Sequence, residues 1–445
     1  MELLQHQIED AAFLASKSFA GCFSGMGSGK TLTALEAVEL VDNVSEKRIT
    51  VIIGPPISLH MWHAEYERHL GYPAQIIKTG KTVFDNVNCY IMSYSIAVAR
   101  MAELKALGIH VLICDESHAL KTPDAKRTVA ILGEGGLVDY TQHAWMLTGT
   151  PSTRYNDDLF SFLRCSGSGE LAARLGKVSL ARFRLRYCIT QKRKFSSHAK
   201  EVEVTVGNRN TEELNDIIFR GGLAVRRELK DVWAAMPPLT KTRLQIDLDM
   251  SADMKLMMKD LKAMSMREVQ SNLMAGEPHI ATVRRELGNS KVKAAVAEIV
   301  ERHDSGVMGG LLVGCWHTEV IDRMVWALSE KGIKAASLDG RSSSAKKQQL
   351  QEDFNEGRLD VLVGQIAAMG VSLNLQKGGS RIIVVEEDFS PATMAQFYAR
   401  LHRMGQDHHV HVDTLYSDNK LDEAIYAISQ RKAAGHTKLM EQLDD

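Results

Sequence analysis

The chain has 445 residues, of which 44% are hydrophobic and 24% charged, a balance that excludes a disordered or membrane-embedded protein. Its length suits two domains of about 200 residues each. The formal net charge of −1 excludes a global basic field, so any surface that contacts nucleic acid must be local.

The cysteines and the N-terminal sequence predict the compartment. The six cysteines stand singly, without zinc-ligand or disulfide-framework spacing, which favours a reducing environment. The N-terminus has no apolar signal core, and no apolar run is long enough to span a membrane. We therefore expect a cytoplasmic protein that has no contact with a membrane.

Short apolar runs bounded by turn-forming residues alternate with helix-like sequence. The first set of runs begins at Phe19, Ile49, Cys89, His110 and Ala144. A second set begins at Gly310, Lys334, Asp360, Arg381 and Val410. Each set predicts βαβ units and a parallel sheet, so the expected fold class is α/β with two parallel-sheet lobes.

The segment between the two sets is rich in Met, Leu and Lys and has helical character. We predict a first lobe over 1–160, helical protrusions and a connection over 161–305, and a second lobe over 306–445. A hinge is expected near 236–242, because Pro237 and Pro238 cannot continue a helix.

The stretch FSGMGSGKT, followed by a helical pattern, is typical of a loop that binds a nucleoside triphosphate. Glycines let backbone N–H groups approach phosphate oxygens, and the helix N-terminus adds positive potential. Lys30 should reach the β and γ phosphates, and Thr31 should offer its hydroxyl to Mg²⁺. The expected nucleotide-binding residues of the loop are Ser24, Gly25, Met26, Gly27, Ser28, Gly29, Lys30 and Thr31. Ser24 departs from the usual glycine, and a glycine-rich turn that binds nothing is the alternative.

Asp115 and Glu116 follow an apolar run, at the strand end where open parallel sheets bind ligands. We expect Asp115 to hold Mg²⁺ and Glu116 to orient the attacking water, with a solvated charged loop as the alternative. His118 in DESH, and Thr148 and Thr150 in LTGTP, are expected to couple nucleotide and nucleic acid. A surface histidine and simple capping threonines are the alternatives.

The stretch QFYARLHRMGQ, residues 396–406, predicts a short helix with an apolar stripe. Gln396, Arg400 and Arg403 recur on a neighbouring polar face, where Gln396 would serve in coupling. Arg400 has no acidic residue three or four positions away, and Arg403 has only Asp407 beyond the expected helix end. A solvated basic face is the alternative.

The stretch ARFRLRYCITQKRK contains no acidic residue and forms the clearest local basic cluster. Its candidate DNA-binding residues are Arg182, Arg184, Lys192 and Arg193. An amphipathic strand whose charges face water is the alternative.

An ordered set of motifs covers nearly the whole chain: LLQHQIEDAAFL, SGMGSGKT, PPISLHMWHAE, DESHALK, LTGTP, LLVGCWH, SLDGR, GVSLNL and QFYARLHRMGQ. This set resembles the Swi/Snf-type branch of superfamily-two helicase-like ATPases, whose two RecA-like lobes close on ATP and step along duplex DNA. The middle segment, which ends in RRELKDVWAAMPP, is similar to the end of the first-lobe protrusion in this family. Of the family's branches, the chain is most similar to the annealing helicases.

The resemblance implies a role for each matching residue. Gln7 would read the adenine edge, and Gly370 would belong to the nucleotide site. Arg400 and Arg403 would be arginine fingers that meet the γ phosphate when the lobes close. The catalytic set would then be Lys30, Glu116, Arg400 and Arg403.

The resemblance also implies contacts to the DNA backbone, which a translocase holds without reading bases. The matching residues are Ser58, Ser93, Tyr94 and Asn374. Two departures lie in the second lobe: Ser372 replaces a glycine, and residues 365–369 follow the family motif loosely.

The leading hypothesis is a DNA-stimulated ATPase that uses ATP and Mg²⁺ to translocate on double-stranded DNA. Single-stranded or forked DNA is a further candidate partner. The alternatives are a strand-separating DNA or RNA helicase and a nucleotide-gated clamp that recruits partners. We expect a monomer, and a bacterial or phage-infected cell as its source, because no reader domain is appended to the two lobes.

Overall fold

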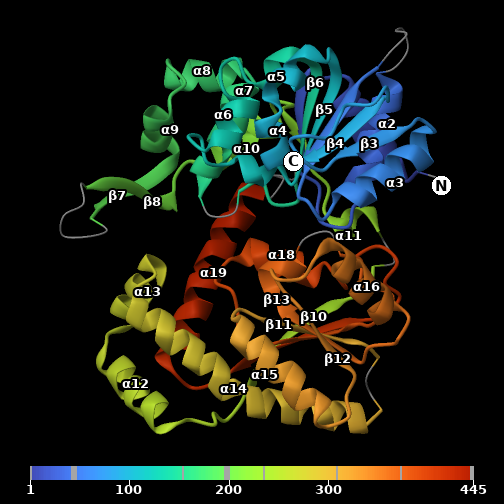
Figure 1. The fold of residues 1–445 in the computed structure, drawn as a ribbon. Helices are drawn as coiled ribbons and strands as arrows, with labels where there is room; N and C mark the ends of the chain where they lie inside the picture. The colour runs from blue at the N-terminus through green and yellow to red at the C-terminus, as the bar shows by residue number, and fades with distance from the viewer. Residues whose placement is uncertain are drawn as a thin grey trace. The chain divides into compact units, whose positions relative to one another are not determined.

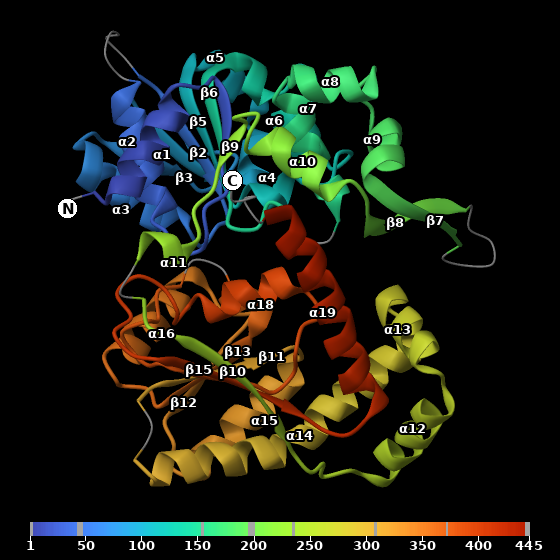
Figure 2. The same ribbon diagram turned by 180° about the vertical axis from the view of Figure 1, so that it is seen from behind.

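The computed structural model describes residues 3–41, 48–152, 155–194, 201–233, 236–306, 309–370 and 373–440, with the backbone alone for residues 193 and 435–440. Ser372, where the sequence departs from its family pattern, lies outside these ranges. Contacts divide the chain into two compact units. Unit 1 comprises Met1–Ala234 with Ala434–Asp445, and unit 2 comprises Ala235–Ala433. Each unit contains a parallel sheet covered by helices (Figures 1 and 2).

Unit 1 is built on a seven-stranded sheet with the order β3-β4-β2-β5-β6-β1-β9, in which all pairs are parallel. Its strands are β1 (Phe19–Cys22), β2 (Thr50–Gly54), β3 (Ala74–Ile77), β4 (Cys89–Ser93), β5 (Ile109–Asp115), β6 (Thr141–Leu147) and β9 (Ala224–Val225). The central strands β2 and β4 are buried along their whole length, which accounts for their continuous apolar runs.

Helices cover both faces of this sheet. One face carries α1 (Gln5–Ala15), α2 (Lys30–Leu40) and α3 (Leu59–Leu70) (Figure 2). The other carries α4 (Tyr94–Ala99), α5 (Met101–Ala106), α6 (Lys126–Leu132), α7 (Phe160–Cys165) and α10 (Thr211–Ile218). Successive residues of β2 alternate between the two cores, with Ile52 in the first and Val51 and Ile53 in the second.

Smaller elements complete unit 1. They are α8 (Gly169–Leu175), α9 (Leu180–Tyr187), α11 (Leu229–Val232), the 3₁₀ turns Ser117–Leu120, Leu137–Tyr140 and Asn156–Leu159, and the antiparallel pair β7 (Cys188–Arg193) and β8 (Val202–Asn208). Leu171 of α8 and Phe183 of α9 are buried in the same core as α7 and α10. These helices therefore belong to unit 1.

Unit 2 is built on a six-stranded parallel sheet with the order β10-β15-β14-β11-β13-β12. Its strands are β10 (Leu239–Gln245), β11 (Leu311–Cys315), β12 (Ala335–Leu338), β13 (Val361–Gln365), β14 (Arg381–Val384) and β15 (Val410–Tyr416). Val313 of β11 faces the core under α14 and α15. A Cβ on the next residue, Gly314, would meet Phe397 of α18 at 2.7 Å, so α18 covers the opposite face.

The helices of unit 2 are α12 (Ala252–Ala263), α13 (Met266–Ala275), α14 (Pro278–Asp304), α15 (Thr318–Ser329), α16 (Ser344–Asn355), α17 (Ile366–Met369), α18 (Pro391–Tyr398) and α19 (Lys420–Met440) up to Ala433. A second core joins α12, α13, α14 and the start of α19. Within the described ranges, no helix combines the length and the apolar character that a membrane span requires.

The predicted α/β class with two parallel sheets is confirmed, and every predicted apolar run forms a strand. The strands that the sequence did not reveal are β3, β7, β8, β9 and β10. Edge strand β10 reads LTKTRLQ and is mostly exposed or half-buried, so it has no continuous apolar run. It begins inside the expected hinge near 236–242, and the hinge itself stays a prediction.

The segment 161–305 does not form a unit of its own. Its first part packs in the core of unit 1 through Leu171 and Phe183, while its last part packs in unit 2 through Ala295 and Ile299 of α14. Contacts divide the chain between Ala234 and Ala235. The predicted boundaries near 160 and 305 therefore differ from the observed division, because these helices bury their apolar faces against the adjoining sheets.

Candidate nucleotide and nucleic-acid site

The phosphate loop joins β1 to α2 in unit 1. Gly27 and Gly29 have φ values of 79° and 84°, a left-handed conformation that other residues adopt only with strain. Gly29 immediately precedes Lys30, the first residue of α2. The structure thus has the strand, loop and helix N-terminus that a phosphate site requires.

Lys30 folds back over its own loop. Its Nζ donates hydrogen bonds to the carbonyl oxygens of Ser24 (2.8 Å) and Gly25 (2.9 Å). Ser28 Oγ is buried and has no hydrogen-bond partner among the described residues. A cation and an unsatisfied hydroxyl in one glycine-rich loop suit a group rich in acceptor oxygens, so the residues present fit the phosphates of ATP.

Asp115 ends β5, and both of its carboxylate oxygens are held. Oδ2 accepts a hydrogen bond from Trp62 Nε1 (2.8 Å), and Oδ1 accepts one from the backbone N–H of Glu116 (2.9 Å). Burial, followed by the charge of Glu116, raises the pKa of Asp115 above its ordinary value, while Trp62 and Lys30 act in the opposite direction. A cation at this carboxylate would offset the cost of burying its charge, so Asp115 fits the expected Mg²⁺ ligand.

Glu116, His118 and Thr148 lie together. His118 Nδ1 is 3.2 Å from Glu116 Oε2 and 3.1 Å from Thr148 Oγ1, and Thr148 Oγ1 also accepts a hydrogen bond from the backbone N–H of Thr150 (3.1 Å). The expected coupling residues of unit 1 are therefore in contact with the expected catalytic glutamate. Their role in coupling stays a prediction.

The LTGTP segment also packs against the phosphate loop. A Cβ on Gly149 would lie 2.9 Å from Met26 Cγ and 3.4 Å from the backbone nitrogen of Met26. A side chain at this position would force the Met26 side chain to shift. Because β5, β6 and β1 are neighbours in the sheet, the segments that follow them meet at one edge.

Gln7 lies on α1 and is buried, with 3% of its surface exposed. Its Oε1 accepts a hydrogen bond from the backbone N–H of Leu4 (2.9 Å). Its neighbour His6 places Nε2 3.0 Å from the carbonyl oxygen of Ser28 in the phosphate loop. Helix α1 therefore borders the loop, and the contact of Gln7 with adenine stays a prediction.

The second group of expected site residues lies in unit 2. Helix α18 ends at Tyr398, so Arg400 and Arg403 lie in the turns that follow and not on a continuous helical face. Arg400 is buried, with 6% exposure, which contradicts a solvated basic face. The polar stripe predicted from helical spacing is therefore wrong, because the backbone leaves the helix before Arg400.

Both arginines point toward the segment after residue 372. Arg400 Nη1 and Arg403 Nη1 donate to the carbonyl oxygen of Leu373, at 3.0 and 3.3 Å, and Arg403 also donates to the side-chain oxygen of Asn374. Burial lowers the pKa of Arg403. Gly370 lies against Gln396, since a Cβ on the glycine would meet Gln396 Cβ at 3.5 Å. The structure thus brings the expected site residues of unit 2 into one cluster.

Three of the residues expected to contact DNA are buried. Ser58 is 0% exposed and donates to the carbonyl oxygen of Pro55 (3.0 Å), while Ser93 caps α4 through the backbone N–H of Ile96. Tyr94 donates to the backbone oxygen of Asp115 (2.7 Å). In this conformation these side chains are not available to a DNA backbone, and the Tyr94 hydroxyl instead holds the backbone at Asp115.

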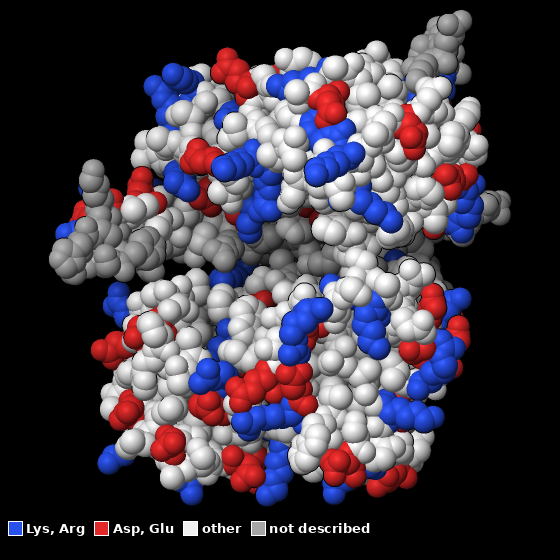
Figure 3. All heavy atoms as spheres, in the orientation of Figure 1, with Lys and Arg blue, Asp and Glu red and all other residues white. Residues whose placement is uncertain are grey.

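The basic stretch after residue 180 forms nearly all of α9 and then the strand β7, not one amphipathic strand. Although the stretch itself has no acid, its arginines find partners elsewhere: Arg184 Nε donates to Asp157 Oδ2 (3.1 Å), and Arg182 Nη1 donates to the carbonyl oxygen of Leu175 (2.8 Å). Lys192 is exposed, and the side chain of Arg193 lies outside the described part of the structure. On the face shown in Figure 3, Lys and Arg lie among Asp and Glu over both units.

Sequence reasoning missed two contacts around the site. Trp62 lies 53 positions from Asp115, and Arg227 lies 203 positions from Ser24, whose Oγ accepts a hydrogen bond from the Arg227 backbone N–H (3.0 Å). The only signal in the sequence was that Trp62 and Arg227 stand inside motifs, PPISLHMWHAE and RRELKDV. Neither motif indicates which residue its members contact.

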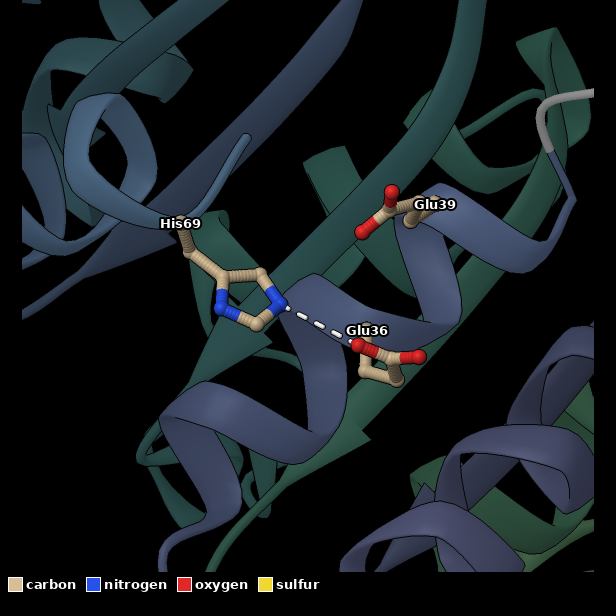
Figure 4. A group of neighbouring side chains, drawn as sticks. All are labelled: Glu36, Glu39 and His69. Carbon is tan, nitrogen blue, oxygen red and sulfur yellow. Dashed lines mark hydrogen bonds and ion pairs between the residues drawn. The ribbon is translucent and has the colours of Figure 1, made fainter. Parts of the chain in front are cut away.

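A further group of potential metal ligands lies on α2 and α3 (Figure 4). One ligand atom from each of Glu36, Glu39 and His69 lies within 4.8 Å of the others. His69 Nε2 is 3.2 Å from Glu36 Oε2, so a hydrogen bond between the two helices accounts for this arrangement without an ion.

Comparisons with known proteins agree with this geometry. A family profile described as "SNF2-related domain" matches residues 6–275, and one described as "Helicase conserved C-terminal domain" matches residues 291–405. A Caenorhabditis elegans protein named "SWI/SNF-related matrix-associated actin-dependent regulator of chromatin subfamily A-like protein 1 homolog" is 26% identical over 77% of this chain and 47% of its own length. The mouse "DNA annealing helicase and endonuclease ZRANB3" is 23% identical over 92% of this chain and 38% of its own length. The chain thus spans less than half the length of these relatives.

A solved structure described as "Sulfolobus solfataricus SWI2/SNF2 ATPase core in complex with dsDNA" matches 100% of this chain and 98% of its own, with 18% identity and a TM-score of 0.44.

The relatives correct one expectation. The two relatives named above, and the human "DNA repair and recombination protein RAD54B", which is 22% identical over 90% of this chain and 50% of its own length, are animal proteins, and their names refer to chromatin, DNA annealing, and DNA repair and recombination. The expected source, the cytoplasm of a bacterium or of a phage-infected cell, is therefore wrong.

The first profile alone covers more than half of the chain, and the second continues it to residue 405. The structure has two α/β lobes of the RecA type, each with a parallel sheet, and it has the phosphate loop and the acidic pair. The chain belongs to the SNF2-related family.

Proposed function

We propose that the protein hydrolyses ATP and uses the energy to translocate on double-stranded DNA. The observation that carries this proposal is the meeting of three segments at the carboxyl ends of adjacent strands: the phosphate loop after β1, the Asp115–Glu116 pair after β5, and Thr148–Thr150 after β6. Ligands of open parallel sheets bind at such ends. Membership of the family supports the choice of ATP and DNA.

Residues of both units have separate roles toward the nucleotide in this proposal. Lys30 and the backbone N–H groups of the loop would bind the phosphates. Glu116 would orient the attacking water and accept the proton that the water loses. Thr31 and Asp115 would hold Mg²⁺, which neutralises charge on the phosphate oxygens when bound. Arg400 and Arg403 would stabilise the negative charge that develops during phosphoryl transfer.

The DNA contacts proposed here differ in part from those expected from sequence. Lys192 is exposed, so it is available to a phosphate, whereas Ser58, Ser93 and Tyr94 are buried. Contacts of this kind neutralise phosphates without reading bases, so binding should weaken steeply as salt rises.

The test is ATP turnover by the purified chain with duplex DNA, single-stranded DNA, RNA or no nucleic acid. We expect the largest rate with duplex DNA. Activity that does not depend on nucleic acid would contradict translocation, and a preference for RNA or single strands would favour a helicase. Displacement of a third strand from a triplex adds a direct measure of movement, and Lys30→Ala should abolish both signals.

A further inference from the structure

The entry of the phosphate loop is paired with strand β9. Backbone N–H groups of Gly21, Phe23 and Gly25 donate in turn to the carbonyl oxygens of Leu223, Val225 and Arg227, at 2.9, 2.8 and 2.7 Å. The sheet ladder therefore continues past the end of β1 at Cys22 and into the loop. The loop is fixed on this side by residues about two hundred positions later in the chain.

Ser24 completes this ladder with its side chain. Its Oγ accepts a hydrogen bond from the backbone N–H of Arg227 (3.0 Å) and donates one to Asp10 Oδ2 of α1 (3.3 Å). The carbonyl oxygen of the same residue accepts from Lys30 Nζ. A glycine here would match the usual loop pattern, yet it would leave the Arg227 N–H without this acceptor.

The side chain of Arg227 closes the network. Its Nε donates to Asp10 Oδ1 (3.0 Å) and its Nη2 to Glu9 Oε2 (2.9 Å). Asp10 is only 2% exposed, and a carboxylate buried this far needs such partners to keep its charge. Removing the Arg227 charge would leave the buried Asp10 carboxylate without its ion-pair partner, whereas Arg227 would keep its contact with Glu9 if Asp10 were neutralised.

We propose that Arg227, acting through Ser24 and Asp10, is a positioning residue that holds the phosphate loop in its binding conformation and so sets the affinity for nucleotide. This inference rests on the proposed function. Arg227 contacts the loop through its backbone N–H, its backbone carbonyl and, by way of Asp10, its guanidinium. Loss of these contacts would enlarge the set of loop conformations, and the binding-competent one would be populated less often.

The test uses the full chain and a fluorescent ADP analogue, with ATP turnover measured in parallel. Ser24→Gly, Arg227→Gln and Asp10→Asn should each weaken ADP binding and raise KM for ATP by about three- to tenfold. At saturating ATP, kcat of Arg227→Gln and of Asp10→Asn should change less than about twofold, because the reacting groups are intact. Arg68→Gln is the matched control, since Arg68 pairs with Glu65 on the exposed surface of α3.

Two comparisons separate positioning from a purely structural role. Asp10→Asn combined with Arg227→Gln should bind ADP no more weakly than the worse single variant, because the two side chains act as one unit. Arg227→Lys, which keeps the charge and the backbone contacts, should restore part of the affinity. Thermal unfolding must show that each variant is folded.

Folded variants that bind ADP like the wild type would overturn the inference, as would losses that simply add in the double variant. A wild type that binds no ADP would instead overturn the proposed function. The two failures are therefore distinguishable.

Discussion

Glu116 has a backbone conformation that is uncommon for a residue with a side chain. Its φ is 49°, in the left-handed region, and the only other such non-glycine residue in the described chain is Asn210. The surrounding bonds hold this conformation, because Glu116 N–H donates to Asp115 Oδ1 (2.9 Å) and its carbonyl accepts from Ala119 N–H (2.9 Å). Backbone strain of this kind concentrates at functional positions, which agrees with a catalytic role.

Replacing Glu116 by Gln tests that role. The amide keeps the size of the side chain and loses its ability to accept a proton, so turnover should fall by roughly 10²- to 10⁴-fold. ATP binding should persist, because Lys30 and the loop are unchanged. Turnover and binding of a fluorescent nucleotide measure the two effects, with the exposed Glu212→Gln as control. Turnover near the wild-type rate would show that another group activates the water.

Trp62 is the second residue whose contact permits a sharp experiment. Trp62→Phe removes the N–H that Asp115 Oδ2 accepts and leaves this oxygen without that donor. We expect a loss of about 1–3 kcal/mol in the free energy of unfolding and a higher Mg²⁺ concentration for half-maximal turnover. Trp145→Phe is the matched control, because Trp145 is equally buried and its Nε1 donates to a backbone oxygen of Lys17 (3.4 Å). If both variants need the same Mg²⁺ as the wild type, Trp62 serves stability alone.

At the scale of elements, the sequence predicted the buried strands and the site residues that follow directly on such a strand. The central strands are continuous apolar runs. Lys30 was recognisable because a strand, a glycine-rich loop and a helix follow one another around it, and Asp115 because it ends an apolar strand. Edge strand β10 was not predicted, because its exposed and half-buried side chains form no apolar run. The end of α18 at Tyr398 was not predicted either. The side chain of Gln406, which is 1% exposed, donates to the carbonyl oxygens of Leu401, Gln376 and Gly379 and so holds a turn in place of a helix.

The contact between α9 and α10 shows that part of the positive charge of the basic stretch is paired with a carboxylate from elsewhere in the chain. Glu213 of α10 accepts two hydrogen bonds from the Arg186 guanidinium, each of 2.7 Å, and one from the Tyr187 hydroxyl (2.6 Å). The Arg186 guanidinium, with Tyr187, holds the pKa of Glu213 at about 2, below its ordinary value of 4.5. These bonds anchor α9 to the core of unit 1.

This pairing predicts a pH-dependent stability. Because the folded pKa of Glu213 is lowered, its contribution is fully present above about pH 4.5 and is lost as the pH falls toward about 2. Glu213→Gln should therefore be less stable than the wild type at pH 7, and the difference should shrink on acidification. Urea unfolding at several pH values measures it, and Glu212→Gln on the same helix is the control. A difference that does not change with pH would contradict the pairing.

At the scale of the whole molecule, the proposed catalytic groups are divided between the two units. Lys30 and Glu116 belong to unit 1, whereas Arg400 and Arg403 belong to unit 2. The arginines are held by carbonyl and amide oxygens of their own unit, at Leu373 and Asn374. Turnover should therefore depend on residues of both units, while nucleotide binding should depend mainly on unit 1.

Arg403→Ala tests this division of work. Loss of the guanidinium should lower kcat by about 10³-fold or more, in the range of other arginine fingers, while ADP binding changes little, because the phosphate loop is intact. Arg403→Lys should restore little, since an ammonium cannot reproduce the planar fork. Arg323→Ala is the matched control in unit 2, because Arg323 pairs with Glu319 on the exposed surface of α15. A variant that loses ADP binding and turnover to the same extent would place Arg403 in ground-state binding, and one with unchanged turnover would remove it from the catalytic set.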